Sequence, residues 1–242
     1  MATIKLPPTQ YAVQLVGPGQ LKLNPAKEVI RPGPCQVLAR VECVSLCFSD
    51  LKLLKQFDQH PRKGIVAKGI SAEALNEIPS YVPGTKPTVP GHEVTLRIVA
   101  VGKKVKHYKV GERCVAQTDY RDLPTAGSTS AFGYNFEGAL QEYVLMDERV
   151  IIDPAGERFL LSVTDQPAAA AAALVEPWAC VEDSYVNVER QTLKAGGRLL
   201  VVADDPARIS LDGLPCDPAG KPAEVLRKTP AQVGALADQS FD

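Results

Sequence analysis

Three side chains in the sequence have the chemistry of zinc ligands, and each stands where the backbone could aim it. Cys47 follows a β-prone run in CVSLCFSD (43–50), and His92 follows a Pro-Gly turn in PGHE (90–93). Glu176 stands at a proline that interrupts a helix-prone stretch. A catalytic zinc takes three such ligands and keeps a fourth position open for water or substrate. Taken one by one, the same residues also fit a packed thiol, a turn histidine and a solvated helix-end charge, so spacing alone leaves both interpretations open.

The cysteine pattern indicates free thiols in a reducing compartment. The six cysteines include no Cys-x-x-Cys pair, so a closed four-cysteine zinc site is not expected. Most of the six would pack like small apolar residues. The short lysine cluster at 103–109 is interpreted as a solvated turn.

The composition excludes several classes of partner. Lys and Arg number 27 against 28 acidic residues, a net charge of −1, so no strong field of one sign favours nucleic acid or an anionic membrane. The N-terminal stretch lacks the apolar core of a signal peptide, and no apolar run reaches membrane-spanning length. We therefore expect a soluble, cytoplasmic protein that binds neither nucleic acid nor membrane.

The elements that must position Cys47 and His92 are short strands separated by turn residues. Strands at this spacing predict a compact barrel or sandwich. Two long segments interrupt the pattern. Residues 52–88 are interpreted as a surface excursion with a short helix at 71–78, and residues 118–139 as a loop rich in Gly, Ser and Thr. The candidate strands are residues 11–17, 20–24, 35–46, 94–102, 113–117 and 140–146.

The sequence changes in character near residue 165. Residues 165–193 favour helices, with Asp165 as a candidate N-cap and Pro177 expected to end or kink the first helix. A glycine turn then leads into the apolar stretch LLVVA (199–203), which is how an α/β unit begins. The rest of the chain carries little strand signal and offers at most two short helices.

Four motifs in a fixed order resemble the medium-chain dehydrogenase/reductase family, the zinc alcohol and sorbitol dehydrogenases with a GroES-like catalytic domain. The resemblance runs from about residue 10 to about residue 203. It implies a mainly β fold: a GroES-like β-barrel at 1–160 with an insertion at about 52–88. Helices and the start of a truncated or degenerate Rossmann-like α/β coenzyme domain would follow at 161–242. The motifs are SLCFSD (45–50), VPGHEVTLRIVAVGKKVKHYKVGERC (89–114), FEGALQEYVLM (136–146) and LVEPWACV (174–181).

The resemblance also implies a ligand set for one catalytic zinc ion. Cys47 and His92 would be ligands, with Glu176 as the third ligand in the manner of sorbitol dehydrogenases. Cys180 competes for that third place, because other branches of the family use a cysteine there. Glu93 is similar to the family's neighbouring glutamate, which lies just behind the metal or replaces a ligand.

Two further residues receive catalytic roles from the same resemblance. Asp50 resembles the carboxylate that holds the zinc-bound histidine, and such a partner fixes the tautomer and strengthens the ligand. Ser49 occupies the Thr/Ser position whose hydroxyl takes the proton of the substrate alcohol. Zinc polarises the substrate oxygen, so that a hydride can leave the adjacent carbon.

The chain departs from the family pattern in three places. The region 118–139 lacks the four closely spaced cysteines of a structural zinc lobe, so no structural zinc is expected. The insertion at 52–88 would be a lid, an interaction surface or an inert addition. After 199–203 the chain enters Asp204-Asp205 in place of a glycine-rich phosphate turn. The residues that bind the coenzyme are therefore unknown, and NAD(P) is expected only for a complete protein.

These observations predict a zinc-dependent alcohol or polyol dehydrogenase in the full-length form. The reaction would be hydride transfer between a secondary alcohol and NAD(P), with a small alcohol, polyol or ketone as substrate, and a homo-oligomer is compatible with it. Two alternatives remain. One is a non-catalytic GroES-like binding protein that uses the insertion, and the other is a zinc enzyme that does not use nicotinamide.

Overall fold

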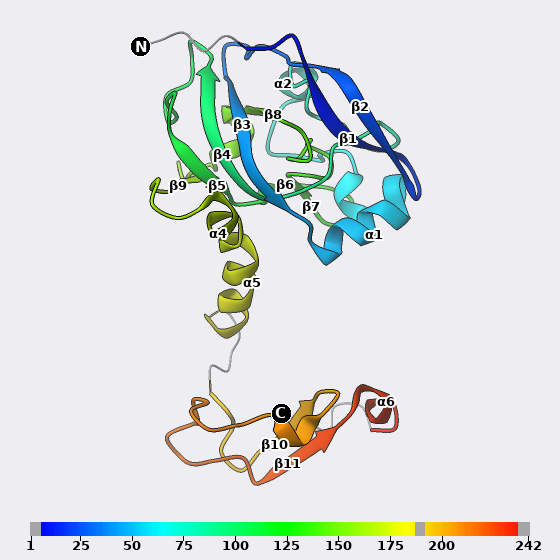
Figure 1. The fold of residues 1–242 in the computed structure, drawn as a ribbon, viewed down its shortest axis with the longest axis vertical. Helices are drawn as coiled ribbons and strands as arrows, with labels where there is room; N and C mark the ends of the chain where they lie inside the picture. The colour runs from blue at the N-terminus through cyan, green and yellow to red at the C-terminus, as the bar shows by residue number, and fades with distance from the viewer. Residues whose placement is uncertain (1–5, 187–191, 237–242) are drawn as a thin grey trace. The chain divides into compact units, whose positions relative to one another are not determined.

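The computed structural model describes residues 6–186 and 192–236, which divide into two compact units, Met1–Trp178 and Ala179–Asp242 (Figure 1). The first unit is built on a five-stranded antiparallel sheet, and the mainly β prediction is confirmed. None of the described helices is both long and apolar enough to cross a membrane. The sheet has the order β8 (Tyr143–Asp147), β3 (Gln36–Ser45), β4 (Glu93–Val101), β5 (Arg113–Ala116) and β9 (Leu160–Ser162).

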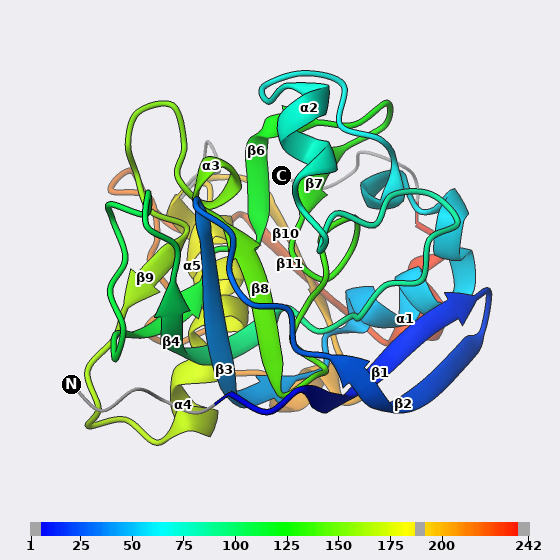
Figure 2. The same cartoon turned by 90° about the horizontal axis from the view of Figure 1, so that it is seen from above.

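Strands β4 and β5 are buried along most of their length, whereas β3 is buried only over its first four residues. Strand β4 lies between β3 and β5, and β3 also pairs with β8 (Figure 2). The main core gathers apolar side chains from these strands, including Val37, Val94, Leu96 and Ile98. All six predicted strands are found, and each lies within a few residues of its expected range. The additional elements around the sheet are a hairpin of β1 (Thr9–Gly17) and β2 (Gln20–Glu28), a pair of β6 (Asp119–Pro124) and β7 (Thr129–Ala131), and the short helix α3 (Glu148–Ile151).

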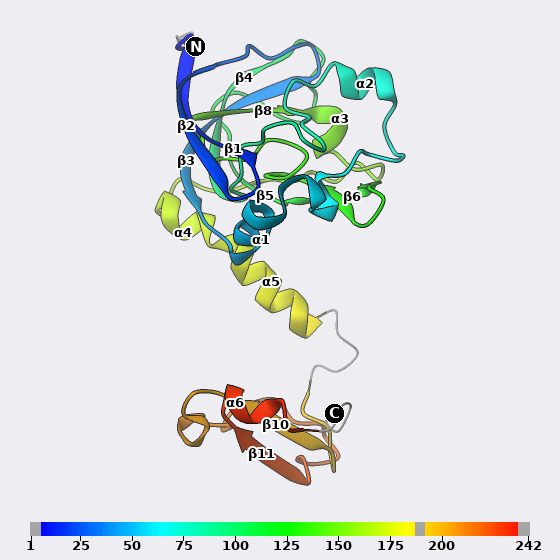
Figure 3. The same cartoon turned by 90° about the vertical axis from the view of Figure 1, so that its right-hand side faces the viewer.

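The insertion at 52–88 is part of the core, so its interpretation as a surface excursion is wrong. It contains the end of α1 (Phe48–Gln56), the short 3₁₀ turns η1 (Phe57–Gln59) and η2 (Pro61–Lys63), and α2 (Ala72–Asn76). The Gly19 N–H of the β1–β2 turn donates to the carbonyl of Leu54, so the hairpin rests against α1 (Figure 3). The insertion contributes buried apolar side chains that lie among polar residues in the sequence, so the pattern did not mark them as buried. They are Leu53, Phe57, Val66, Leu75 and Ile78.

The helices that follow the sheet begin and end differently from the prediction. Helix α4 (Ala169–Ala173) has Ala168 at its N-cap, so Asp165 does not cap it; the Asp165 carboxylate instead lies 2.6 Å from the guanidinium of Arg97. The break falls at Leu174, and Pro177 lies in the first turn of α5 (Val175–Val186). A proline is tolerated there, since the first N–H groups of a helix have no intrahelical acceptor.

The second unit contains two parallel strands in register, β10 (Arg198–Val202) and β11 (Glu224–Lys228). Strand β10 confirms the predicted apolar strand. It leads through Asp204 into Asp205, which precedes the 3₁₀ turn η3 (Pro206–Arg208) and lies 3.5 Å from the guanidinium of Arg208. Parallel strands in an α/β unit are usually joined through an α-helix, whereas the connection from β10 to β11 contains only the turn η3. The unit also carries the short helix α6 (Pro230–Val233).

Lys63 is the largest side chain that the insertion buries completely. Its ammonium donates to the carbonyls of Val82 and Lys86, the latter at 2.9 Å, and lies 5.7 Å from the centre of the Phe57 ring. Burial lowers the pKa of Lys63 to about 8, although the carboxylate of Glu137 opposes the change. The Lys63 ammonium therefore links the Phe57 end of the insertion to the carbonyls of Val82 and Lys86. The cost of this link is the loss of water around a buried charge.

We predict that the stability of the first unit rises with pH in a way that depends on Lys63. The pKa of Lys63 is about 8 in the folded protein and 10.5 in the unfolded chain. Between these pH values Lys63 is protonated in the unfolded chain but largely neutral in the folded protein. The free energy of unfolding should therefore rise by about 2 kcal/mol between about pH 7.5 and pH 9.5, from this residue alone. Denaturant unfolding at both pH values measures it, with Lys63→Met as the comparison. Equal pH slopes in the two proteins would contradict the prediction.

Candidate metal centre

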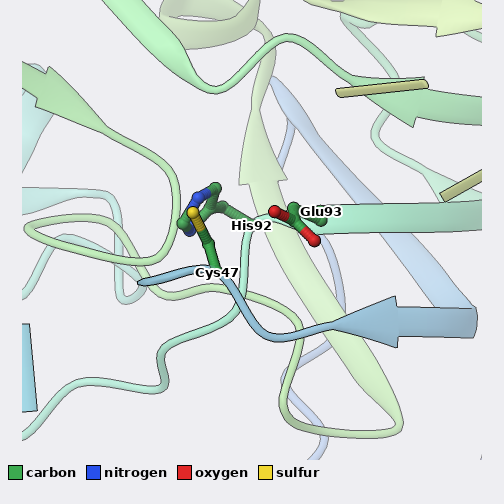
Figure 4. A group of neighbouring side chains, drawn as sticks. All are labelled: Cys47, His92 and Glu93. Atoms are coloured by element: carbon green, nitrogen blue, oxygen red, sulfur yellow. The ribbon is translucent and has the colours of Figure 1, made fainter. Parts of the chain in front are cut away.

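Three metal-ligating side chains meet at one end of the central sheet. One ligand atom from each of Cys47, His92 and Glu93 lies within 4.8 Å of the other two (Figure 4). His92 and Glu93 are buried and Cys47 is partly exposed, so the group is open on the thiol side. A thiolate, an imidazole and a carboxylate are the donors that zinc takes in catalytic sites. The residues present therefore fit a zinc ion.

Cys47 is placed by the junction between β3 and α1. The strand ends at Ser45 and the helix begins at Phe48, so Cys47 occupies the N-cap position in an extended conformation. Its backbone N–H donates to a carboxylate oxygen of Asp50 at 2.9 Å. The other cysteine of CVSLCFSD, Cys43, pairs with Thr95 within the sheet and is not a member of the ligand group.

His92 is placed by the turn that precedes β4. Gly91 has a φ of +91°, a left-handed conformation that glycine adopts without a steric penalty. A Cβ at this position would also approach Leu140 and Val44 to 3.0 Å. The turn therefore requires glycine, and it directs the next side chain toward Cys47. The expectation that Pro-Gly fixes the direction of the imidazole agrees with this geometry.

Asp50 connects the two ligand segments. One of its oxygens accepts the Cys47 N–H, and the other accepts the Gly91 N–H at 3.3 Å and lies 3.4 Å from Nδ1 of His92. That contact is an ion pair without hydrogen-bond alignment, and Nδ1 has no hydrogen-bond partner among the described residues. Burial alone would lower the pKa of His92, but the adjacent carboxylate of Asp50, with help from Cys47 and Glu176, raises it to about 9. Burial would raise the pKa of Asp50, but the adjacent His92 ring and the N–H groups of Cys47 and Gly91 together outweigh burial and lower that pKa.

The two glutamates occupy different places relative to this pair. Glu93 begins β4, is buried, and accepts a hydrogen bond from the Ser45 hydroxyl at 2.5 Å. Glu176 lies in the first turn of α5, and its charge acts on His92. Among the described residues, however, Glu176 is outside the group whose ligand atoms lie within 4.8 Å. Cys180, the competing third ligand, belongs to the second unit.

Ser49 and a tyrosine that the sequence did not indicate complete the site. The Ser49 hydroxyl lies 3.4 Å from Nε2 of His92. Burial raises the pKa of Tyr134 to about 12, and the Ser49 side chain opposes the rise. The Tyr134 ring lies 5.7 Å from that of His92 and 5.0 Å from that of His60, which comes from the insertion. The only sequence signal for Tyr134 and His60 was their position in the two long segments, 118–139 and 52–88.

Comparison with known proteins identifies the family. A sequence profile of the alcohol dehydrogenase GroES-like domain matches residues 33–154, half of the chain. Sorbitol dehydrogenase of Bos taurus is 33% identical over 107 residues, which are 44% of this chain and 24% of that protein. D-xylulose reductase of Morganella morganii is 30% identical over 152 residues, 61% of this chain and 38% of that protein. The chain thus matches less than half the length of these curated relatives.

Solved structures share the fold. The crystal structure of 2R,3R-butanediol dehydrogenase from Bacillus subtilis aligns with a TM-score of 0.57 at 21% identity, over 96% of this chain and 67% of that one. A putative zinc-binding dehydrogenase from Sinorhizobium meliloti 1021, bound to NADP, aligns with a TM-score of 0.53 at 21% identity, over 81% and 49%. With its GroES-like domain and these relatives, the chain belongs to the medium-chain dehydrogenase/reductase family of zinc alcohol dehydrogenase-like proteins.

Proposed function

We propose that the complete protein is a zinc-dependent alcohol or polyol dehydrogenase, which transfers a hydride between a secondary alcohol and NAD(P). The convergence of Cys47, His92 and Glu93, in a chain of this family, is the observation that carries the proposal. Its similarity to sorbitol dehydrogenase and D-xylulose reductase supports a small alcohol, polyol or ketone as substrate. The proposal extends to a cytoplasmic location, a homo-oligomer, and a catalytic domain at 1–160 followed by a partial coenzyme domain at 161–242.

Cys47 and His92 would hold a single zinc ion, with a glutamate as the third ligand. Glu176 is the ligand that the family resemblance implies, and Glu93 is the carboxylate that already lies beside the other two. The charge of Glu176 acts on His92, and a carboxylate oxygen of Glu93 lies close to the ligand atoms of Cys47 and His92. We therefore propose Glu176 as the third ligand, with Glu93 able to replace it. When bound, zinc acts as a Lewis acid that polarises the substrate oxygen and lowers the pKa of the alcohol.

Asp50 and Ser49 would supply the remaining chemistry. Asp50 lies against Nδ1 of His92, which leaves Nε2 for the metal and keeps the imidazole oriented. Ser49 stands beside that Nε2, where its hydroxyl can accept the proton of a substrate alcohol and pass it on. Both residues are thus within contact distance of the histidine that defines the site.

A second candidate function depends on whether the protein binds a nicotinamide coenzyme. The described second unit places Asp204 and Asp205 directly after β10, where two carboxylates disfavour a pyrophosphate. This feature favours a zinc enzyme that does not use nicotinamide, or a binding protein that keeps the barrel. Hydride transfer is therefore proposed for the protein with a complete coenzyme domain, and nicotinamide binding separates the candidates.

We predict that the purified chain binds about one zinc ion, and that Cys47→Ser and His92→Ala abolish most of this binding because each removes a ligand. Asp50→Asn should weaken zinc affinity about 10- to 100-fold, since it removes the charge behind the histidine. Metal analysis after dialysis measures the zinc content. Cys43→Ser is the matched control and should retain the metal, because Cys43 is a half-buried thiol of β3, the strand that precedes Cys47.

The same measurement assigns the third ligand. Glu176→Gln should release zinc if Glu176 coordinates it, whereas Glu93→Gln should release zinc if Glu93 does. Unchanged zinc in Cys47→Ser would refute the ligand set as a whole.

We further predict that zinc-loaded protein with a complete coenzyme domain reduces NAD(P) in the presence of a secondary alcohol, and that chelation abolishes the rate. Absorbance of the reduced nicotinamide at each alcohol or polyol in a panel measures the activity. Ser49→Ala should lower kcat about 100-fold while zinc content stays the same, because it removes the proton acceptor. A protein that binds zinc but no nicotinamide would exclude the dehydrogenase and favour the second candidate.

A further inference from the structure

The Glu93 carboxylate is held by a side chain to which the proposed function gives no role. Its oxygen Oε2 accepts a hydrogen bond from the Ser45 hydroxyl at 2.5 Å, the short distance of a bond to a charged acceptor. Within the described residues this is the only hydrogen bond to the Glu93 side chain. Because Glu93 is 6% exposed, the bond fixes a carboxylate that has little solvent around it.

The pairing of β3 with β4 explains why the Ser45 hydroxyl reaches Glu93. The two residues are direct partners at the end of the antiparallel register. Side chains directly opposite each other in such a pair lie on the same face of the sheet, with their Cβ atoms about 5 Å apart. The hydrogen bond is therefore a consequence of the strand register, and a slip of one residue would remove it.

Cys47 follows Ser45 on the same side of the chain. Both residues are half-buried, whereas Leu46 between them is 69% exposed. Cys47 has an extended backbone, and side chains two positions apart in extended backbone point the same way. The segment that supplies the thiol thus also supplies the group that orients the carboxylate.

A carboxylate that is held at one oxygen can still bind a metal through the other. An ionised carboxylate has about four acceptor positions on its two oxygens, and Ser45 occupies one of them at Oε2. An oxygen of Glu93 lies within 4.8 Å of the ligand atoms of Cys47 and His92. Hydrogen bonds to ligating carboxylates orient them toward the metal, and their loss lowers metal affinity.

We propose that Ser45 is a positioning residue, whose hydroxyl holds Glu93 so that this carboxylate can bind a metal ion beside the thiol and the imidazole. His92 has its own carboxylate partner in Asp50, so two adjacent metal-ligating residues are each oriented by a side chain of the 45–50 segment. The inference rests on the zinc site of the proposed function and is independent of the nicotinamide coenzyme.

The zinc affinity of the purified chain, measured by competition with a chromogenic chelator, tests this role without any activity measurement. Ser45→Ala removes the hydroxyl and should weaken zinc binding about tenfold. Ser45→Thr keeps a hydroxyl on a residue that suits a strand, so it should retain most of the affinity. Ser162→Ala is the matched control and should leave the affinity unchanged, because the Ser162 hydroxyl donates to Glu112, which is outside the metal-ligating group.

A substitution cycle separates the orientation of Glu93 from general support of the strand. In Glu93→Gln, the further change Ser45→Ala should alter zinc affinity less than about twofold, because the oriented ligand is gone. In Glu176→Gln the full effect of Ser45→Ala should appear, since Glu93 is then the remaining carboxylate. An effect confined to the Glu176→Gln chain would also support the proposal, with Glu93 as the substitute ligand.

Two results would overturn the proposal while leaving the zinc site intact. One is a loss of affinity of equal size with and without the Glu93 carboxylate. The other is an unchanged affinity after Ser45→Ala in both the wild-type and the Glu176→Gln chains. A wild-type chain that binds no zinc would instead refute the proposed function, and the positioning role with it.

Discussion

The site depends on one buried carboxylate that joins two separate segments of the chain. Asp50 accepts the N–H groups of Cys47 and Gly91 and lies against the His92 ring. Without it, the N–H groups of Cys47 and Gly91 would lose their acceptor. The carboxylate is costly to bury, and its cost is offset because every contact that it makes is to an N–H donor or a cationic ring.

The sheet supplies the rigid frame on which this link acts. Strands β3 and β4 pair along most of their length, and Ser45 lies opposite Glu93 at the end where the ligands meet. Two strand ends in register bring their neighbouring residues to the same edge, so Cys47 and His92 approach each other although they are 45 positions apart in the sequence. Sites on the ends of paired strands are positioned more accurately than sites on free loops.

Prediction and structure differ most in the two long segments, 52–88 and 118–139. Their composition indicated solvent, but the insertion buries Leu53, Phe57 and Lys63, and 118–139 buries Tyr134. The reason is that their apolar residues follow neither the helical nor the strand period, so no pattern in the sequence separates them from exposed ones. The ring contacts of Tyr134 with His60 and His92 join residues 74 and 42 positions apart, so no local signal could have shown them.

The sequence alone indicated four of the five strands of the central sheet and the turn at Pro90-Gly91, since local periodicity and turn residues encode them. Cys47, His92 and Asp50 were singled out by the resemblance of their motifs to a known family, because spacing alone left their roles open. Glu93, which the sequence offered as a neighbour of the metal, acquired its place beside Cys47 and His92 only in the folded chain. The burial of the insertion and the place of Tyr134 beside the His92 ring were likewise decided by tertiary structure. The physical reason is that a site of this kind is a convergence of distant segments, and convergence depends on packing that no local pattern contains.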